Sequence, residues 1–139
     1  KNIPSMAIHE LVHYQQSYAD SNTNVLGYAI KEGSADFISK LITGKITDKV
    51  YFQYGDIHEK ELWDEFKKDM KGDNINKWLY NRGTDVRPGD LGYYIGYKIT
   101  ESYYLNHRNK KAAINEILNI KDFDLFLKES RYETKFNDL

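Results

Sequence analysis

Residue types that bind and activate metal ions occur together near the start of the chain. His9, Glu10 and His13 belong to the sequence His-Glu-Leu-Val-His, in which the two histidines are four residues apart. On a helix this spacing puts both imidazole rings on one face, about one turn apart along the axis. Two such rings can reach one tetrahedral ion at ~2.0–2.1 Å each, and Glu10 can then take a proton from water at that ion. The spacing therefore predicts a hydrolytic zinc site.

A third protein ligand is needed, because two histidines do not complete a zinc site. The chain has no cysteine, so that ligand must be another histidine or a carboxylate. Glu32 and Asp36 follow in the sequence Glu-Gly-Ser-Ala-Asp, and residues 14–31 are enough to end one helix, turn, and return antiparallel to it. We expect Glu32 to supply the third ligand atom. Asp36, one turn further, is expected to accept a hydrogen bond from the distal N–H of His9 and to fix its tautomer.

Helices are the elements expected to position these residues. Apolar periodicity and capping residues predict helices over Pro4 to Tyr18, Val25 to Ile42 (capped by Asn24 and Gly44), Asp56 to Gly72, Tyr93 to Asn106, Lys110 to Leu118 and Phe123 to Glu129. Between them we expect a polar turn over Asp20 to Asn24, a short strand over Lys49 to Tyr54, and a long irregular connection from Gly72 to Gly92. The predicted fold class is mainly α, with little or no sheet.

Gly33 lies inside the second predicted helix, directly after Glu32. A glycine in a helix interior costs about 1 kcal/mol relative to alanine. We therefore expect Gly33 to allow a close approach of the first two helices, so that both can bind one ion.

These spacings carry a resemblance to a known superfamily. His9-Glu-x-x-His13 followed by Glu32-x-x-x-Asp36 resembles the gluzincin signature of thermolysin-like metallopeptidases. The resemblance implies a zincin-like helical core, with His9, His13 and Glu32 as zinc ligands, Glu10 as the general base, and Asp36 hydrogen-bonded outside the ligand set.

A narrower resemblance covers residues 8–104. The two motif blocks, together with Gly92-Tyr-Tyr-Ile-Gly96, are similar to predicted Zn-dependent proteases of bacteria, including proteins related to gliding-motility lipoproteins of Bacteroidetes. This resemblance implies an exported or lipid-anchored bacterial protein. The length of 139 residues and the lack of an internal boundary predict a single domain over residues 1–139, and the resemblance implies that this is a metallopeptidase catalytic domain. Because the chain begins at Lys1 and enters its first helix almost at once, we expect it to be the C-terminal part of a longer protein.

Hydrolysis by a gluzincin also uses a donor for the developing oxyanion. Tyr94 is the candidate, because the Gly92-x-Tyr94-x-Gly96 pattern opens a helix directly after the long connection. Tyr93 and Tyr97 are the neighbouring hydroxyls. The remaining histidines, His58 and His107, are the other possible donors.

Composition limits the partners of the protein. The chain carries 20 Lys and Arg residues against 21 Asp and Glu residues, which argues against binding nucleic acid by bulk electrostatics. No apolar run approaches the ~20 residues of a membrane span. The expected partner is a peptide or protein substrate, and the expected reaction is zinc-dependent hydrolysis of a peptide bond.

Three alternatives remain compatible with the sequence. The site could hydrolyse an amide other than a peptide. The chain could be a non-catalytic zinc-containing module related to gliding-motility lipoproteins, although an intact Glu10 argues against that, since a structural zinc site needs no base. The chain could also be a helical interaction partner without a metal.

Overall fold

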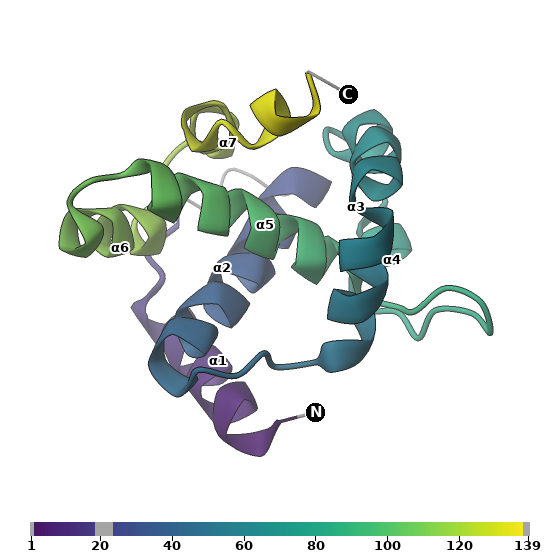
Figure 1. Ribbon diagram of the computed structural model, residues 1–139, viewed down its shortest axis with the longest axis horizontal. Helices are drawn as coiled ribbons and strands as arrows, with labels where there is room; N and C mark the ends of the chain where they lie inside the picture. Colours follow the sequence, from purple (N-terminus) through teal and green to yellow (C-terminus); the bar gives the residue numbers. More distant parts are fainter. Residues whose placement is uncertain (1, 19–23, 138–139) are drawn as a thin grey trace.

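Two crossing helices form the centre of the molecule (Figure 1). In this computed structural model, which describes residues 2–18 and 24–137, they are α2 (Val25–Thr43) and α5 (Leu91–Asn106). A Cβ added to Gly33 would lie 2.1 Å from the backbone nitrogen of Tyr97, and one added to Gly96 would lie 1.7 Å from the carbonyl oxygen of Ala29. The two backbones therefore touch at this crossing. We expected Gly33 to allow a close approach of the first two helices, and this was wrong. The helix that approaches Gly33 closely is α5.

Gly96→Ala is expected to destabilise the protein by more than the ~3 kcal/mol upper range of usual overpacking, because backbone and not a flexible side chain would have to move. The gain in helix propensity, about 1 kcal/mol, is too small to offset this. The measurement is urea unfolding. Gly72→Ala is the control, since its Cβ would meet only the Asp69 carbonyl oxygen, at 3.2 Å. Equal unfolding midpoints for the two variants would contradict the account of the crossing.

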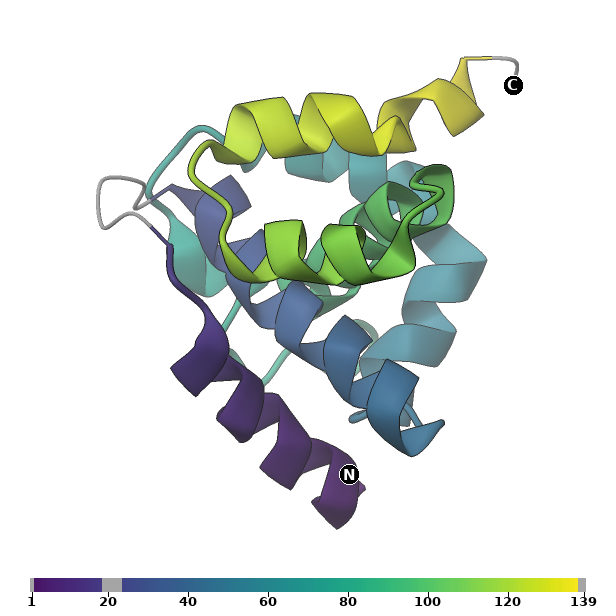
Figure 2. The ribbon, with the colours of Figure 1, turned by 90° about the vertical axis from the view of Figure 1, so that its left-hand side faces the viewer.

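Helix α1 (Ile3–Gln15) lies antiparallel to α2 (Figure 2). Polar contacts pair residues in opposite directions along the two helices: Ser5 with Ser39, His9 with Asp36, and His13 with Glu32. The predicted antiparallel arrangement is confirmed. The helix ends before Tyr18, where we expected its end, because the backbone N–H of Ser17 and the Tyr18 hydroxyl donate instead to carbonyls of Leu118 and Ile117.

The remaining helices surround α5. They are α3 (Lys49–Asp69), the one-turn α4 (Ile75–Trp78), α6 (Lys110–Leu118), α7 (Phe123–Ser130) and the 3₁₀ helix η1 (Tyr132–Phe136). Within residues 2–18 and 24–137 there is no strand, only an isolated bridge between Gly83 and Pro88. The mainly α fold class is confirmed. None of the described helices is long and apolar enough to cross a membrane.

The strand predicted over Lys49 to Tyr54 was wrong, since these residues form the first part of α3. Asp48 caps this helix by accepting a hydrogen bond from the Val50 N–H, and Tyr51 and Phe52 are buried. Packing of these aromatic side chains outweighs their preference for strands. The helix start predicted at Asp56 lies inside α3, close to a kink at which His58 leaves helical geometry (φ −113°, ψ 20°).

The connection from Gly72 to Gly92 is irregular, as predicted, except for α4. Trp78 and Leu79 are fully buried and anchor it. The next residue, Tyr80, has a left-handed backbone conformation (φ 58°), which is uncommon for a bulky side chain. The segment that follows projects away from the helices in Figure 1. The predicted turn over Asp20 to Asn24 lies outside the described residues, apart from Asn24, which caps α2.

Candidate metal centre

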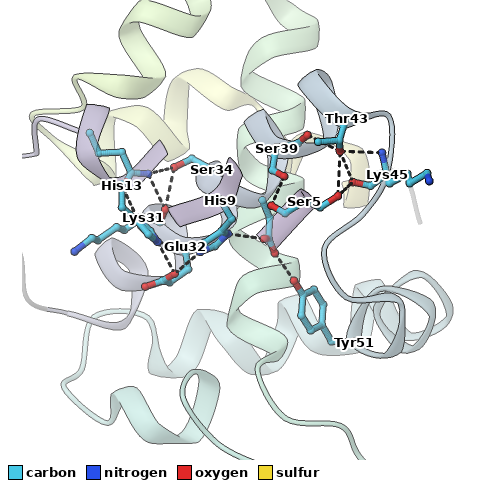
Figure 3. A network of polar contacts seen from close by, with 12 residues as sticks. Ser5, His9, His13, Lys31, Glu32, Ser34, Ser39, Thr43, Lys45 and Tyr51 are labelled. Carbon is cyan, nitrogen blue, oxygen red and sulfur yellow. Dashed lines mark hydrogen bonds and ion pairs between the residues drawn. The ribbon is translucent and has the colours of Figure 1, made fainter. Parts of the chain in front are cut away.

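Helices α1 and α2 bring three potential ligands together (Figure 3). The Nε2 atoms of His9 and His13 are 2.9 Å apart, and Glu32 Oε2 lies 3.2 Å from the first and 3.1 Å from the second. Three atoms bound at ~2.0–2.1 Å to a tetrahedral zinc ion lie ~3.3 Å from one another. The triangle therefore has nearly the dimensions that a zinc site requires.

The hydrogen bonds of the two rings fix which nitrogen faces this triangle. His9 Nδ1 lies 2.6 Å from Asp36 Oδ1, and His13 Nδ1 lies 2.7 Å from Gln16 Oε1. The orientation of the Gln16 amide is set by its Nε2, which donates to the Lys31 carbonyl. Both Nδ1 atoms thus donate, so that each ring, when it is neutral, presents the lone pair of its Nε2 to the triangle. Three electron-rich atoms then converge, an arrangement that a cation between them stabilises.

The charges of the site agree with this chemistry. Burial works to lower the pKa of His9, but hydrogen bonds and negative charge from Asp36 and Glu32 outweigh it and raise the pKa to about 9. Burial works to raise the pKa of Glu32, but hydrogen bonds from His13, His9 and Tyr80 hold it well below its usual range. The hydrogen bond to Glu32 also raises the pKa of His13. Glu32 is therefore ionised, and without a metal the site attracts protons.

Both carboxylates are held by tyrosines. The Tyr80 hydroxyl donates to Glu32 Oε1 at 2.6 Å, so that only Oε2 faces the two imidazoles. The Tyr51 hydroxyl donates to Asp36 Oδ2 (Figure 3). Asp36 is only 2 % exposed, and a buried carboxylate needs such partners.

Glu10 belongs to the same helix but is exposed to solvent. Together with His9 it borders a cavity of about 110 Å³. Its carboxylate is not one of the three converging ligand atoms. Glu10 is thus placed beside the ligands and open to water and substrate.

A protein-family model described as Predicted Zn-dependent protease (DUF2268) matches residues 1–125. The chain belongs to this family. Neither the comparison with curated proteins nor that with solved structures finds a match. The family is predicted to be zinc-dependent, and the buried group of His9, His13 and Glu32 is able to bind the metal. Zn²⁺ is accordingly the cofactor that the site fits, and a peptide is the class of substrate that the family description gives.

The fold does not bring Tyr94 to the metal centre. Its ring is fully buried, and its hydroxyl donates to Asp56 of α3 at 3.0 Å. The neighbouring Tyr93 is closer, because its ring stacks on His9 with 6.1 Å between centroids. Tyr97 is also buried and donates to Glu101.

The other two histidines also lie elsewhere. His58 pairs with Glu61 on the exposed side of α3, and His107 ends α5 and lies against Tyr103. Sequence reasoning missed three residues of the site, namely Gln16, Tyr51 and Tyr80. Only the position of Gln16, one turn after His13, carried a signal that could have found it.

Proposed function

We propose that this chain is a zinc-dependent peptidase of the gluzincin type, in which His9, His13 and Glu32 hold the ion and Glu10 is the general base. The observation that supports this most is the convergence of two imidazoles and a carboxylate beside the helix position of Glu10. When bound, the zinc ion polarises the scissile carbonyl and lowers the pKa of the attacking water towards ~7.

Glu10 carries the proton transfers in this proposal. Its carboxylate accepts a proton from the attacking water and then delivers it to the leaving amine. Its exposure lets both water and substrate reach it. Proton transfer by a positioned side chain contributes ~10²–10⁴-fold to such reactions.

Asp36 and Gln16 act through the histidines. Each accepts from an Nδ1–H and so directs the Nε2 lone pair towards the ion. Such partners orient the ligands, and their loss typically costs ~10–100-fold in metal affinity. Neither residue touches the reacting atoms.

Tyr80, rather than the buried Tyr94, is the proposed donor to the negative charge that develops on the carbonyl oxygen. Its hydroxyl lies next to the metal ligands, and its side chain is half exposed, at 52 %. Burial and the neighbouring Glu32 raise its pKa, so the hydroxyl keeps its proton. In this proposal its single O–H turns from Glu32 Oε1 to the substrate oxygen as the negative charge develops. Tyr80 directly follows Trp78 and Leu79, whose burial fixes this part of the chain. From there its left-handed backbone conformation directs the side chain towards Glu32.

Tyr80→Phe is expected to lower kcat by about 10²-fold at saturating zinc, because one oxyanion donor is removed. Tyr94→Phe is the matched control and should change kcat less than about threefold, since it loses only the bond to Asp56. Steady-state kinetics on one cleaved peptide separates the two. A larger loss in Tyr94→Phe than in Tyr80→Phe would return the role to Tyr94.

The proposed activity is tested with a mixed peptide library and mass spectrometry of the new termini. The zinc-loaded chain should cleave peptides, the chelated chain should not, and added zinc should restore cleavage. If the zinc-loaded chain cleaved other amides but no peptide, the site would be a hydrolase of another class. If it cleaved nothing, the enzymatic proposal would fall.

A further inference from the structure

The two histidines of the metal centre are held by partners of different chemistry. His9 Nδ1 faces the carboxylate of Asp36, whose two oxygens both accept hydrogen bonds. His13 Nδ1 faces the side-chain amide of Gln16, which accepts at its oxygen and donates at its nitrogen. If this amide were turned end for end, it would donate to His13 Nδ1, and a neutral ring would then carry its proton on Nε2. The orientation of the Gln16 amide therefore decides whether His13 can bind a metal.

The nitrogen of the Gln16 amide donates to two acceptors on α2. Its Nε2 lies 2.9 Å from the Lys31 carbonyl oxygen and 2.9 Å from Ser34 Oγ. An amide nitrogen carries two protons, so both are used here. Ser34 is fully buried and lies beside His13 and Lys31 (Figure 3). A carbonyl can only accept, but the Ser34 hydroxyl accepts from Gln16 only when its own proton points to another group.

Two acceptors other than Gln16 are within reach of the Ser34 proton. Tyr18 Oη lies 2.9 Å from Ser34 Oγ, and the Lys31 carbonyl oxygen lies 3.1 Å from it. The Tyr18 hydroxyl donates its own proton to the Ile117 carbonyl oxygen at 2.8 Å, so its oxygen accepts from Ser34. With the Ser34 proton in either bond, a lone pair of Ser34 Oγ remains for the Gln16 nitrogen.

Tyr18 is fixed in turn by α6 and α7. The last carbonyls of a helix have no partner within it, and Tyr18 satisfies that of Ile117, in the last turn of α6. The Tyr18 ring also packs edge-on against Phe123, the first residue of α7, with 5.3 Å between centroids. The hydrogen bonds that begin at His13 thus form a network that ends on α6, a helix that supplies no metal ligand.

We propose that Ser34 and Tyr18 are positioning residues, which keep the Gln16 amide in the one orientation that lets His13 bind zinc. Neither side chain supplies one of the converging ligand atoms, and each acts through the next hydrogen bond of the network. His9 needs no such network, because either oxygen of a carboxylate accepts from its Nδ1–H. The proposal rests on the part of the proposed function that makes His13 a zinc ligand.

Ser34→Ala is expected to weaken zinc binding about 3- to 10-fold, the factor that corresponds to one hydrogen bond, because the Gln16 amide loses one of two acceptors. Loss of Gln16 itself should cost more, in the ~10–100-fold range of residues that bond a ligand histidine directly. Tyr18→Phe should cost about threefold, since Ser34 keeps the Lys31 carbonyl as an acceptor. Competition with a chromophoric chelator gives these affinities. Unchanged affinity in Ser34→Ala would overturn the proposal.

Matched controls come from side chains of the same kind outside the network. Ser39 is a fully buried serine on the same helix, and its hydroxyl donates to the Ser5 carbonyl oxygen at 2.7 Å. Tyr132 is also buried and donates to Glu59 at 2.9 Å. Ser39→Ala and Tyr132→Phe should leave zinc affinity within about twofold of the unsubstituted chain. Losses equal to those of the test variants would indicate a general effect of packing and would overturn the proposal.

Proton exchange at the two imidazoles tests the positioning role independently of affinity. The Nδ1–H protons of His9 and His13 are followed by NMR in the zinc-loaded, ¹⁵N-labelled chain. Ser34→Ala should speed exchange of the His13 proton with water about fivefold, the factor for one typical hydrogen bond, and leave the His9 proton unchanged. Equal acceleration at both rings, or none at His13, would overturn the proposal.

A double substitution tests whether the effect passes through the amide. In a Gln16→Ala background, Ser34→Ala should cause no further loss of zinc affinity, because both substitutions act on the same contact to His13. Fully additive losses would mean that Ser34 acts by another route, and the proposal would fall.

These measurements need no substrate, so they separate the inference from the proposed peptidase activity. If zinc binding responds as expected and no peptide is cleaved, the peptidase falls and the positioning role stands. If peptides are cleaved and Ser34→Ala binds zinc normally, the positioning role falls and the peptidase stands.

Discussion

Glu10→Gln is expected to lower kcat by about 10³-fold while zinc stays bound. An amide cannot take the proton from the attacking water, and general-base catalysis contributes ~10²–10⁴-fold. Zinc is retained because Glu10 supplies none of the three converging ligand atoms. The measurements are kcat on a cleaved peptide and zinc per chain by inductively coupled plasma mass spectrometry.

The control for this substitution is Glu129→Gln, on the exposed side of α7. It makes the same chemical change away from the metal centre, and its rate should stay within about twofold of the unsubstituted chain. Full activity in Glu10→Gln would contradict the proposed mechanism. Loss of zinc from the same variant would mean that Glu10 is a ligand and not a base.

Glu32→Ala is expected to weaken zinc binding by more than about 100-fold, beyond the ~10–100-fold range for residues that only orient the ligands. Both imidazoles face Glu32 Oε2, so the substitution removes one of the three atoms that would bind the ion. Asp36→Asn should fall within the smaller range, because it removes only the charge next to His9 Nδ1. Competition with a chromophoric chelator gives both affinities.

Glu65→Ala provides the comparison for a carboxylate with a partner outside the site, since Glu65 is bound by Arg87. Zinc affinity should not change in that variant. If Glu32→Ala bound zinc as tightly as the unsubstituted chain, the third ligand would lie elsewhere. If Asp36→Asn lost more affinity than Glu32→Ala, the two carboxylates would have exchanged roles.

The residues that the sequence could place are those governed by local helix geometry. His9 and His13 share a helix face because of their spacing, and Glu32 and Asp36 reach them because the next helix returns antiparallel. These positions depend on the period of one helix and the length of one connection. Tyr80, in contrast, lies in an irregular segment and reaches Glu32 through its own left-handed backbone conformation. No periodic pattern in the sequence predicts such a conformation.

Helix periodicity alone could not predict which tyrosine lies near the metal centre. Tyr93 and Tyr94 are adjacent on α5, yet one stacks on His9 and the other bonds Asp56 on the opposite side. Which of them faces α1 depends on how α5 crosses α2. That crossing is set by backbone contact at Gly33 and Gly96, a long-range feature that periodicity does not contain.

The strand expected over Lys49 to Tyr54 failed for a related reason. Its aromatic composition is typical of strands, but Tyr51 and Phe52 are buried against other helices. The same packing brings the Tyr51 hydroxyl to Asp36. Tertiary contacts thus decided both the element and its part in the site.

The most direct test of the metal centre is X-ray diffraction from zinc-loaded crystals, with data collected on both sides of the zinc absorption edge. We expect one anomalous peak per chain at ~2.0–2.2 Å from the Nε2 atoms of His9 and His13 and a carboxylate oxygen of Glu32. The peak should be absent from crystals of His9→Ala. A zinc peak at other residues, or none at the triangle when zinc is in excess, would contradict the proposed site.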